Sequence, residues 1–197
     1  MRGRTLVVMK WLFGSSLLML CAVSALAVEP VPASPFLVGV CTHFGQGKGV
    51  LAANLSLIRQ AGIASIRDEV LWNGIEKEKG RLQMPAAWDT FVRQAEAAGI
   101  EPMLILDYGN RFYDGGDKPV SDAATDAFVR YAEFVVRHFR GVVRHYEIWN
   151  EYDISIGSKT PGSAENYAKL LKKVYPRIKA IDPSIVVYGG AMTPTGV

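Results

Sequence analysis

Polar and aromatic side chains follow four short apolar stretches of the sequence. The residues best suited to catalysis or ligand binding are His43, Arg67, Tyr108, Asn150 and Glu151. A carboxylate can act as a general acid or base, and an amide and a guanidinium form hydrogen bonds with hydroxyl groups. Aromatic rings add flat apolar faces. Together these side chains indicate a site for a ligand rich in hydroxyl groups, such as a carbohydrate.

The elements that must position these residues alternate along the chain. Strands are predicted at residues 36–41, 64–67, 103–106, 145–149 and 185–188. Apolar residues at helical spacing predict helices within residues 50–61, 88–95, 128–139 and 167–181. Strands that alternate with helices form parallel sheets with helical crossovers. Two folds fit this pattern, a closed (β/α)8 TIM barrel and an open doubly wound sheet.

The glycine-rich segment at residues 45–49 bears on the open-sheet alternative. Nucleotide-binding sheets carry a GxGxxG turn after the first strand or a phosphate loop that ends in GK[ST]. The segment reads G-Q-G-K-G and matches neither pattern. A nucleotide-dependent enzyme on an open sheet is therefore disfavoured, and the segment is interpreted as a flexible connection.

The segment E-I-W-N-E at residues 147–151 resembles a known signature. It looks like the end of strand four in the clan A retaining glycoside hydrolases, whose fold is the (β/α)8 barrel. Further landmarks occur in the same order, namely I-R at 66–67, W-x2-I-E-x3-G at 72–80, W-D at 88–89 and the third strand at 104–108. Within the clan, the sequence most resembles family 39, the xylosidase and iduronidase family, and the related exopolysaccharide hydrolases.

This resemblance implies a retaining O-glycosyl hydrolase that acts on a glycoside or polysaccharide. Glu151 would be the general acid/base, which protonates the leaving oxygen and then activates water. Asn150 would hydrogen-bond the sugar 2-hydroxyl, and Arg67 would lie beneath the second catalytic carboxylate. The remaining candidate substrate-binding residues are His43, Trp72 and Tyr108.

Each candidate also has a purely structural interpretation. Glu151 could be a surface or helix-start carboxylate, and Arg67 could be a structural ion-pair partner. His43 could be a hydrogen-bonded structural histidine. Trp72 and Tyr108 could be core aromatic residues.

Other polar residues are expected to be structural. Glu147 lies four residues before Glu151 and is expected to form an ion pair. The charged segment 76–80 is expected to be an exposed turn, and Cys41 a buried, inert thiol. His138 and His145 have no partners at metal-ligand spacing, so neither a metal nor another cofactor is expected.

The first 27 residues are predicted to be a secretory signal peptide. Basic residues precede an apolar stretch at 12–23, and A-L-A follows at 25–27. The apolar stretch is shorter than the ~20 residues that a membrane-spanning helix needs. We therefore expect export to the periplasm or cell exterior, no membrane attachment after cleavage, a short linker at 28–35, and the barrel portion at 36–197.

The remaining chain has no excess of charge. The sequence contains 22 basic and 19 acidic residues, and three of the basic residues lie in the predicted signal peptide. Without a basic surface field, neither nucleic acid nor an acidic membrane is an expected partner. The expected partner is an oligosaccharide or polysaccharide.

A retaining mechanism needs a second carboxylate about 5–5.5 Å from the first, as the nucleophile. In the family that this sequence resembles, that residue ends strand seven, whereas five strands are recognisable here. Neither Glu69 nor Asp107 is expected to replace it. The nucleophile is therefore expected beyond residue 197, and the chain is expected to be an incomplete barrel that is inactive by itself. The alternative is a non-catalytic carbohydrate-binding fragment or a degenerate, truncated barrel.

Overall fold

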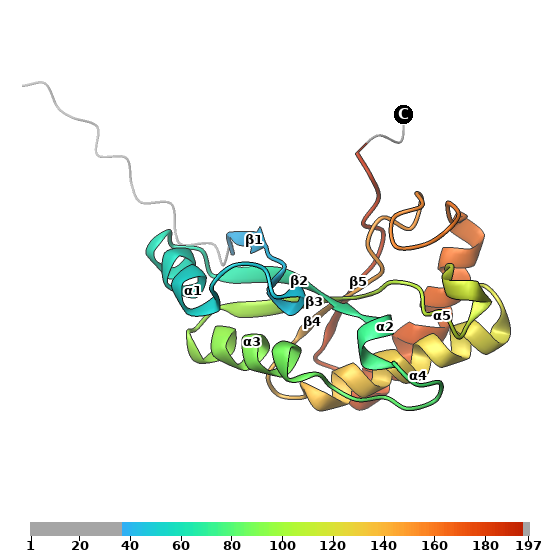
Figure 1. The fold of residues 1–197 in the computed structure, drawn as a ribbon, viewed down its shortest axis with the longest axis horizontal. Coiled ribbons are helices and arrows are strands. Elements are labelled where there is room, and N and C mark those ends of the chain that lie inside the picture. The colour runs from blue at the N-terminus through green and yellow to red at the C-terminus, as the bar shows by residue number, and fades with distance from the viewer. Residues whose placement is uncertain (1–36, 195–197) are drawn as a thin grey trace, which may run out of the picture. The chain divides into compact units, whose positions relative to one another are not determined.

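The five predicted strands form one parallel sheet in the computed structural model, which describes residues 37–194 (Figure 1). Strands that are consecutive in the chain are neighbours in the sheet. Their bounds are β1 Gly39–Cys41, β2 Ser65–Leu71, β3 Glu101–Asp107, β4 His145–Ile148 and β5 Val186–Tyr188. This order confirms the predicted β/α alternation. The predicted signal peptide and linker lie outside the described residues.

Helices connect the strands, as the periodicity predicts (Figure 1). The α-helices are α1 Leu51–Gln60, α2 Trp72–Ile75, α3 Ala86–Ala97, α4 Asp122–His138 and α5 Ala164–Ile181, and the 3-10 turns are η1 Phe44–Gln46 and η2 Asp114–Gly116. Ser121 and Ser163 cap the two longest helices, because each side chain accepts a hydrogen bond from a main-chain N–H three residues on.

Several boundaries differ from the prediction, and the largest differences concern the segment that follows Arg67. Strand β2 continues to Leu71, so Asp68 and Glu69 lie within the strand rather than after it. The short helix α2 occupies residues between the predicted strand at 64–67 and the predicted helix at 88–95, where no helix was predicted. A single helical turn is too short to give a clear periodicity, which explains why the sequence pattern did not predict it.

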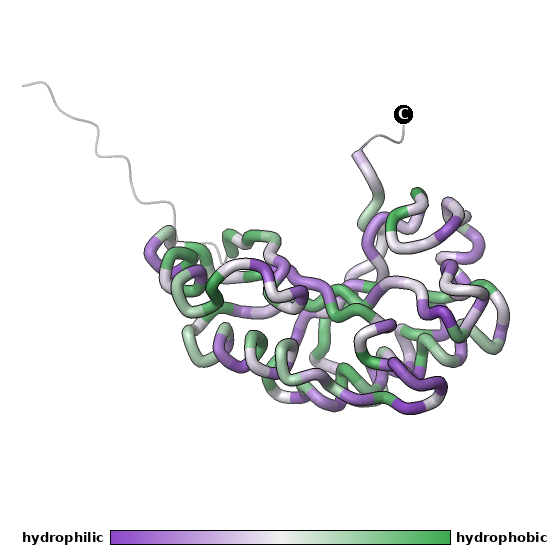
Figure 2. Tube along the Cα trace, in the orientation of Figure 1, coloured by the Kyte–Doolittle hydropathy of each residue, from purple (hydrophilic) through white to green (hydrophobic). Residues whose placement is uncertain are grey.

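Alternate residues of the strands face opposite sides of the sheet. One side packs against the helices and is apolar, with Ile66 and Val70 of β2 and Leu104 of β3 fully buried in the core. The helices contribute to this core mainly through α3, α4 and α5. Green and purple alternate along α3 and α4, as expected for helices with one apolar face (Figure 2).

The other side of the sheet carries charged side chains. Arg67 is aligned with Met103 across the β2–β3 ladder, and Ile105 is aligned with Glu147 across the β3–β4 ladder. This register places Arg67 and Glu147 on the same face, with β3 between their strands. Within residues 37–194, no helix is both long and apolar enough to cross a membrane.

Candidate functional site

Arg67, within β2, forms an ion pair with Glu147, near the C-terminal end of β4. The Arg67 Nε and Nη2 atoms donate to the two Glu147 carboxylate oxygens at 2.8 and 2.6 Å. This two-point contact raises the pKa of Arg67 further above its usual value. The ion pair expected for Glu147 is therefore present, and its partner is Arg67.

Asn150 extends this ion pair toward β3. Its Oδ1 accepts a hydrogen bond from Arg67 Nη2 at 2.8 Å, and its Nδ2 donates to the Tyr108 hydroxyl at 2.9 Å. Both ends of the amide are therefore held in one orientation. An amide fixed in this way presents the same hydrogen-bonding groups to every ligand that reaches it.

Tyr108 connects Asn150 to Glu69. Its hydroxyl donates to Glu69 Oε1 at 3.2 Å, and Gln46 Nε2 donates to Glu69 Oε2 at 2.5 Å. Burial raises the pKa of Tyr108 above its usual range, so the hydroxyl keeps its proton and remains a donor to Glu69. The result is a continuous chain of hydrogen bonds from η1 to the residue that precedes Glu151.

Glu151 directly follows Asn150, the last residue of this chain of hydrogen bonds, and lies three residues after β4 ends at Ile148. Its main-chain N–H donates to the Ala191 carbonyl at 2.9 Å, which fixes it beside the segment that follows β5. The side chain is partly exposed, and its carboxylate makes no hydrogen bond to residues 37–194. Its φ is +53°, in the left-handed region that residues other than glycine rarely adopt.

His43 follows β1 and lies beside Glu69. Its ring Nδ1 is 3.9 Å from Glu69 Oε2, and its side chain is 57% exposed. The adjacent Thr42 hydroxyl and Phe44 N–H both donate to the Asp68 carboxylate, at 2.7 and 2.6 Å. These bonds tie the loop that bears His43 to β2, so His43 lies at the edge of the chain of hydrogen bonds.

Trp72 does not lie in this group. Its side chain is fully buried, its ring stacks on Tyr113 with centroids 5.1 Å apart, and its Nε1 donates to Glu76 Oε2 at 2.7 Å. A buried ring cannot stack on a sugar, which corrects the expectation that Trp72 binds substrate. It is a core residue, in agreement with its structural interpretation.

Two further expectations are also corrected. Glu76 was expected in an exposed turn, but it is 3% exposed and accepts hydrogen bonds from Trp72, Tyr113 and the Gly80 N–H. Cys41 was expected to be buried, but it is exposed, with its Sγ 3.6 Å from Arg67 Nη1. Cys41 lies on the charged face of the sheet rather than the apolar one, because the alternation of β1 places it in line with Arg67.

Glu69 and Asp107 are the carboxylates that the sequence interpretation placed near the strand ends without giving them a role. Glu69 lies two residues after Arg67, and that even spacing is the signal that both share one face of β2. Asp107 is fully buried, and neither of its oxygens has a hydrogen-bond partner among the described residues. Burial, together with the nearby Glu69 and Glu147 carboxylates, raises the pKa of Asp107 well above its usual value.

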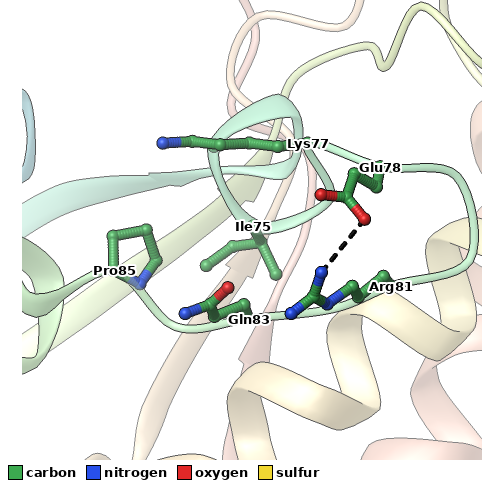
Figure 3. Close-up of a pocket in the computed structure, with 7 residues that line it drawn as sticks. Ile75, Lys77, Glu78, Arg81, Gln83 and Pro85 are labelled. Carbon is green, nitrogen blue, oxygen red and sulfur yellow. Dashed lines mark hydrogen bonds and ion pairs between the residues drawn. The ribbon is translucent and has the colours of Figure 1, made fainter.

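Two cavities lie beside the segment that follows β2. One of about 140 Å³ is lined by residues 74–85, where Glu78 and Arg81 form an ion pair, and it contains no candidate site residue (Figure 3). A larger one of about 610 Å³ is lined by Asn73, Asn110, Arg111 and Gly157. Among residues 37–194, no cluster of His, Cys, Asp and Glu side chains could hold a metal ion.

Known structures share this arrangement of strands and helices. A family 39 glycoside hydrolase from Bacteroides cellulosilyticus matches with a TM-score of 0.66 and 28% identity, over 78% of this chain and 31% of that one. A monomeric β-xylosidase from Caulobacter crescentus matches with a TM-score of 0.65 and 18% identity, over 82% of this chain and 37% of that one. The chain is structurally similar to part of a clan A glycoside hydrolase.

A third match is the virulence factor SghA from Agrobacterium tumefaciens in complex with its substrate analogue salicin. Its TM-score is 0.56 at 17% identity, over 77% of this chain and 46% of that one. No protein-family model and no curated protein sequence matches the chain. The chain thus spans between about a third and a half of the length of these three structures, and it has the fold of the corresponding part of a TIM barrel.

Proposed function

We propose that this chain forms part of a retaining O-glycosyl hydrolase, with Glu151 as its general acid/base. The observation that carries the proposal is the position of Glu151. It follows an amide whose two ends are fixed by Arg67 and Tyr108, at the end of a strand where TIM-barrel enzymes place their active sites. The similarity to glycoside hydrolases supports the same reaction class.

In this proposal Glu151 first donates a proton to the departing glycosidic oxygen. After the nucleophile has displaced the leaving group, Glu151 removes a proton from the water that releases the sugar. Asn150 binds the sugar 2-hydroxyl, an interaction that strengthens in the transition state. The nucleophilic carboxylate comes from a part of the barrel outside these 197 residues.

The charged neighbours of Glu151 have distinct proposed roles. Arg67 orients Asn150, and its positive charge keeps the nucleophilic carboxylate ionised before it attacks. Tyr108 and Glu69 fix the other end of the amide. His43 is exposed at the edge of the chain of hydrogen bonds, where it can contact a bound saccharide.

The test is hydrolysis of glycosides by the protein as its gene encodes it, with Glu151→Gln compared with the wild type. On substrates with poor leaving groups, we expect kcat/KM to fall by about 10²–10⁴-fold, because no acid assists departure. Activated aryl glycosides need little acid, so the loss on them should be much smaller. The control is Glu96→Gln, which makes the same chemical change on an exposed residue of α3.

The proposal fails if Glu151→Gln loses activity equally on both kinds of substrate. Sugar binding without hydrolysis by the wild type would instead support the non-catalytic carbohydrate-binding alternative. Tryptophan fluorescence titration with oligosaccharides would detect such binding.

We also propose that the protein is exported, because residues 1–27 have the layout of a cleaved signal peptide. Mass spectrometry of the protein from fractionated cells should find a mature N-terminus at Val28 outside the cytoplasm. An intact Met1 in the cytoplasmic fraction would contradict export.

A further inference from the structure

Lys118 lies between η2 and α4, and its ammonium group is enclosed by the loop that carries Glu151. The residue is 2% exposed. Its Nζ donates to the carbonyls of Ile154 and Thr160 at 2.8 and 2.7 Å, and also to the Ser158 hydroxyl. An ammonium group has three hydrogens to donate, so its full donor capacity is directed at one loop, residues 149–163.

Aromatic rings cover the same ammonium group. Lys118 Nζ is 5.4 Å from the ring centroid of Tyr152 and 5.8 Å from that of Trp149. Both distances suit a cation–π contact. These two aromatic residues lie on either side of Asn150 and Glu151 in the sequence, so Lys118 contacts the chain both before and after the proposed catalytic pair.

The neighbouring Asp117 binds the donors of the same loop. Its carboxylate accepts hydrogen bonds from the Lys159 N–H at 3.1 Å, the Thr160 N–H at 3.3 Å and the Thr160 hydroxyl at 2.9 Å. Lys118 thus holds the carbonyls of this loop while Asp117 holds its N–H groups. The loop has no helix or strand of its own that could fix it.

The backbone of the loop needs such external support. Trp149 and Glu151 have φ angles of +65° and +53°, which lie in the left-handed region. Residues other than glycine hold this conformation only where their surroundings determine it. The surroundings here include the Leu106 and Ala191 carbonyls, which bind the N–H groups of Trp149 and Glu151, and the Lys118 ammonium group.

We propose that Lys118 is a positioning residue that holds Glu151 in place for proton transfer. The proposal rests on the proposed role of Glu151. Lys118 does not touch the substrate. It acts by holding the loop around the proposed acid/base, and its loss leaves Glu151 present but misplaced.

The test compares Lys118→Met with Lys159→Met in the protein as its gene encodes it. Methionine keeps most of the length of the side chain and removes the ammonium group. Lys159 lies on the same loop but is exposed, so it is the matched control. We expect Lys118→Met to lower kcat on poor leaving groups by about tenfold or more, with KM little changed, because positioning errors act on the transition state. On activated aryl glycosides the loss should stay below about threefold.

A double variant shows whether the effect passes through Glu151. In a Glu151→Gln background, Lys118→Met should cause no further loss on poor leaving groups, since the group that it positions is already gone. A purely structural role would lower activity on both kinds of substrate and in both backgrounds, and that result would overturn the proposal.

A milder variant keeps the proposal testable if Lys118→Met does not fold. Ser158→Ala removes one acceptor of the ammonium group and should shift the leaving-group preference in the same direction by a smaller factor. Activity of Ser158→Ala equal to wild type on both substrates would count against the proposal. If Glu151→Gln shows no leaving-group preference, the proposed function fails. If Glu151→Gln shows that preference but Lys118→Met behaves like the control Lys159→Met, the positioning role of Lys118 alone fails.

Discussion

Two polar clusters on the same face of the sheet show how position decides the role of similar residues. The first, called here the Arg67 cluster, consists of Arg67, Glu147, Asn150, Tyr108 and Glu69. The second, the His145 cluster, lies at the start of β4. There His145 Nε2 is 2.8 Å from Glu101 Oε1, and its Nδ1 is 2.9 Å from the Tyr188 hydroxyl.

The clusters differ in burial and in extent. Glu147 in the Arg67 cluster is 3% exposed, whereas the His145 and Glu101 side chains are 23% and 35% exposed. The Arg67 cluster continues from strand to strand and ends beside Glu151, while the His145 cluster is confined to its three members. In parallel barrels the C-terminal strand ends carry catalysis and the opposite ends carry stability. The Arg67 cluster should therefore control both activity and stability, and the His145 cluster stability alone.

Arg67→Met should give the largest effect. It leaves the buried Glu147 carboxylate without its cation, which should lower the free energy of unfolding by about 3 kcal/mol, and it removes the group that orients Asn150. Urea denaturation measures the stability. The double variant Arg67→Met/Glu147→Met should regain most of the stability but none of the activity. A double variant that regains activity would show that the pair is only structural.

Asp107→Asn should change stability in the opposite direction. Because the pKa of Asp107 is raised in the folded state, its favourable contribution is complete below the unfolded pKa of about 3.9 and is lost as the pH rises toward the folded value. The amide variant does not titrate, so it should be more stable than the wild type at pH 8, and this advantage should shrink as the pH falls to 4. Thermal unfolding from pH 4 to 8 measures this difference. A variant that is less stable than wild type at pH 8 would contradict the account.

Tyr108→Phe should have a smaller effect, centred on catalysis. It removes the hydroxyl that joins Asn150 to Glu69 and leaves the ring contact with Trp149 unchanged. We expect about a tenfold lower kcat/KM and a loss of about 1 kcal/mol in stability. Steady-state kinetics on one substrate with a poor leaving group measure the change in kcat/KM, and urea denaturation measures the change in stability. Unchanged kinetics together with the expected stability loss would remove Tyr108 from the candidate site.

His145→Phe should have the smallest effect. Its hydrogen bonds to Glu101 and Tyr188 are partly exposed, so the loss in stability should be about 0.5–1 kcal/mol, with kcat/KM unchanged. The same urea and kinetic measurements apply. A clear fall in kcat/KM would mean that the two clusters are coupled, and the comparison between them would no longer hold.

The sequence predicted the strands and the larger helices because apolar periodicity depends on local spacing. It also placed Asn150 and Glu151 after the end of a strand and gave Glu147 an ion pair, whereas Arg67, predicted to end its strand, lies within β2. It could not show that Arg67 is the partner of Glu147, since 80 residues separate them and only the register of three strands brings them together. Trp72 was misplaced for a related reason. The burial of an aromatic ring depends on Tyr113 and Phe128, which lie far along the chain.

The positive φ angles of Trp149 and Glu151 also could not be predicted from the sequence. Sequence patterns point to glycine at such positions, and neither residue is glycine. The conformation depends on contacts from other parts of the chain, among them Lys118. No pattern in the sequence indicated that Lys118 is buried, because a lysine in a polar loop is usually exposed.

Rescue of Glu151→Ala by azide tests the central claim most directly. With an activated aryl glycoside, this variant should form the glycosyl-enzyme but release it slowly, because no base activates water. Azide needs no base, so it should raise turnover and yield a glycosyl azide with the same anomeric configuration as the substrate. No acceleration by azide, or a product of inverted configuration, would contradict the assignment of Glu151 as the acid/base of a retaining enzyme.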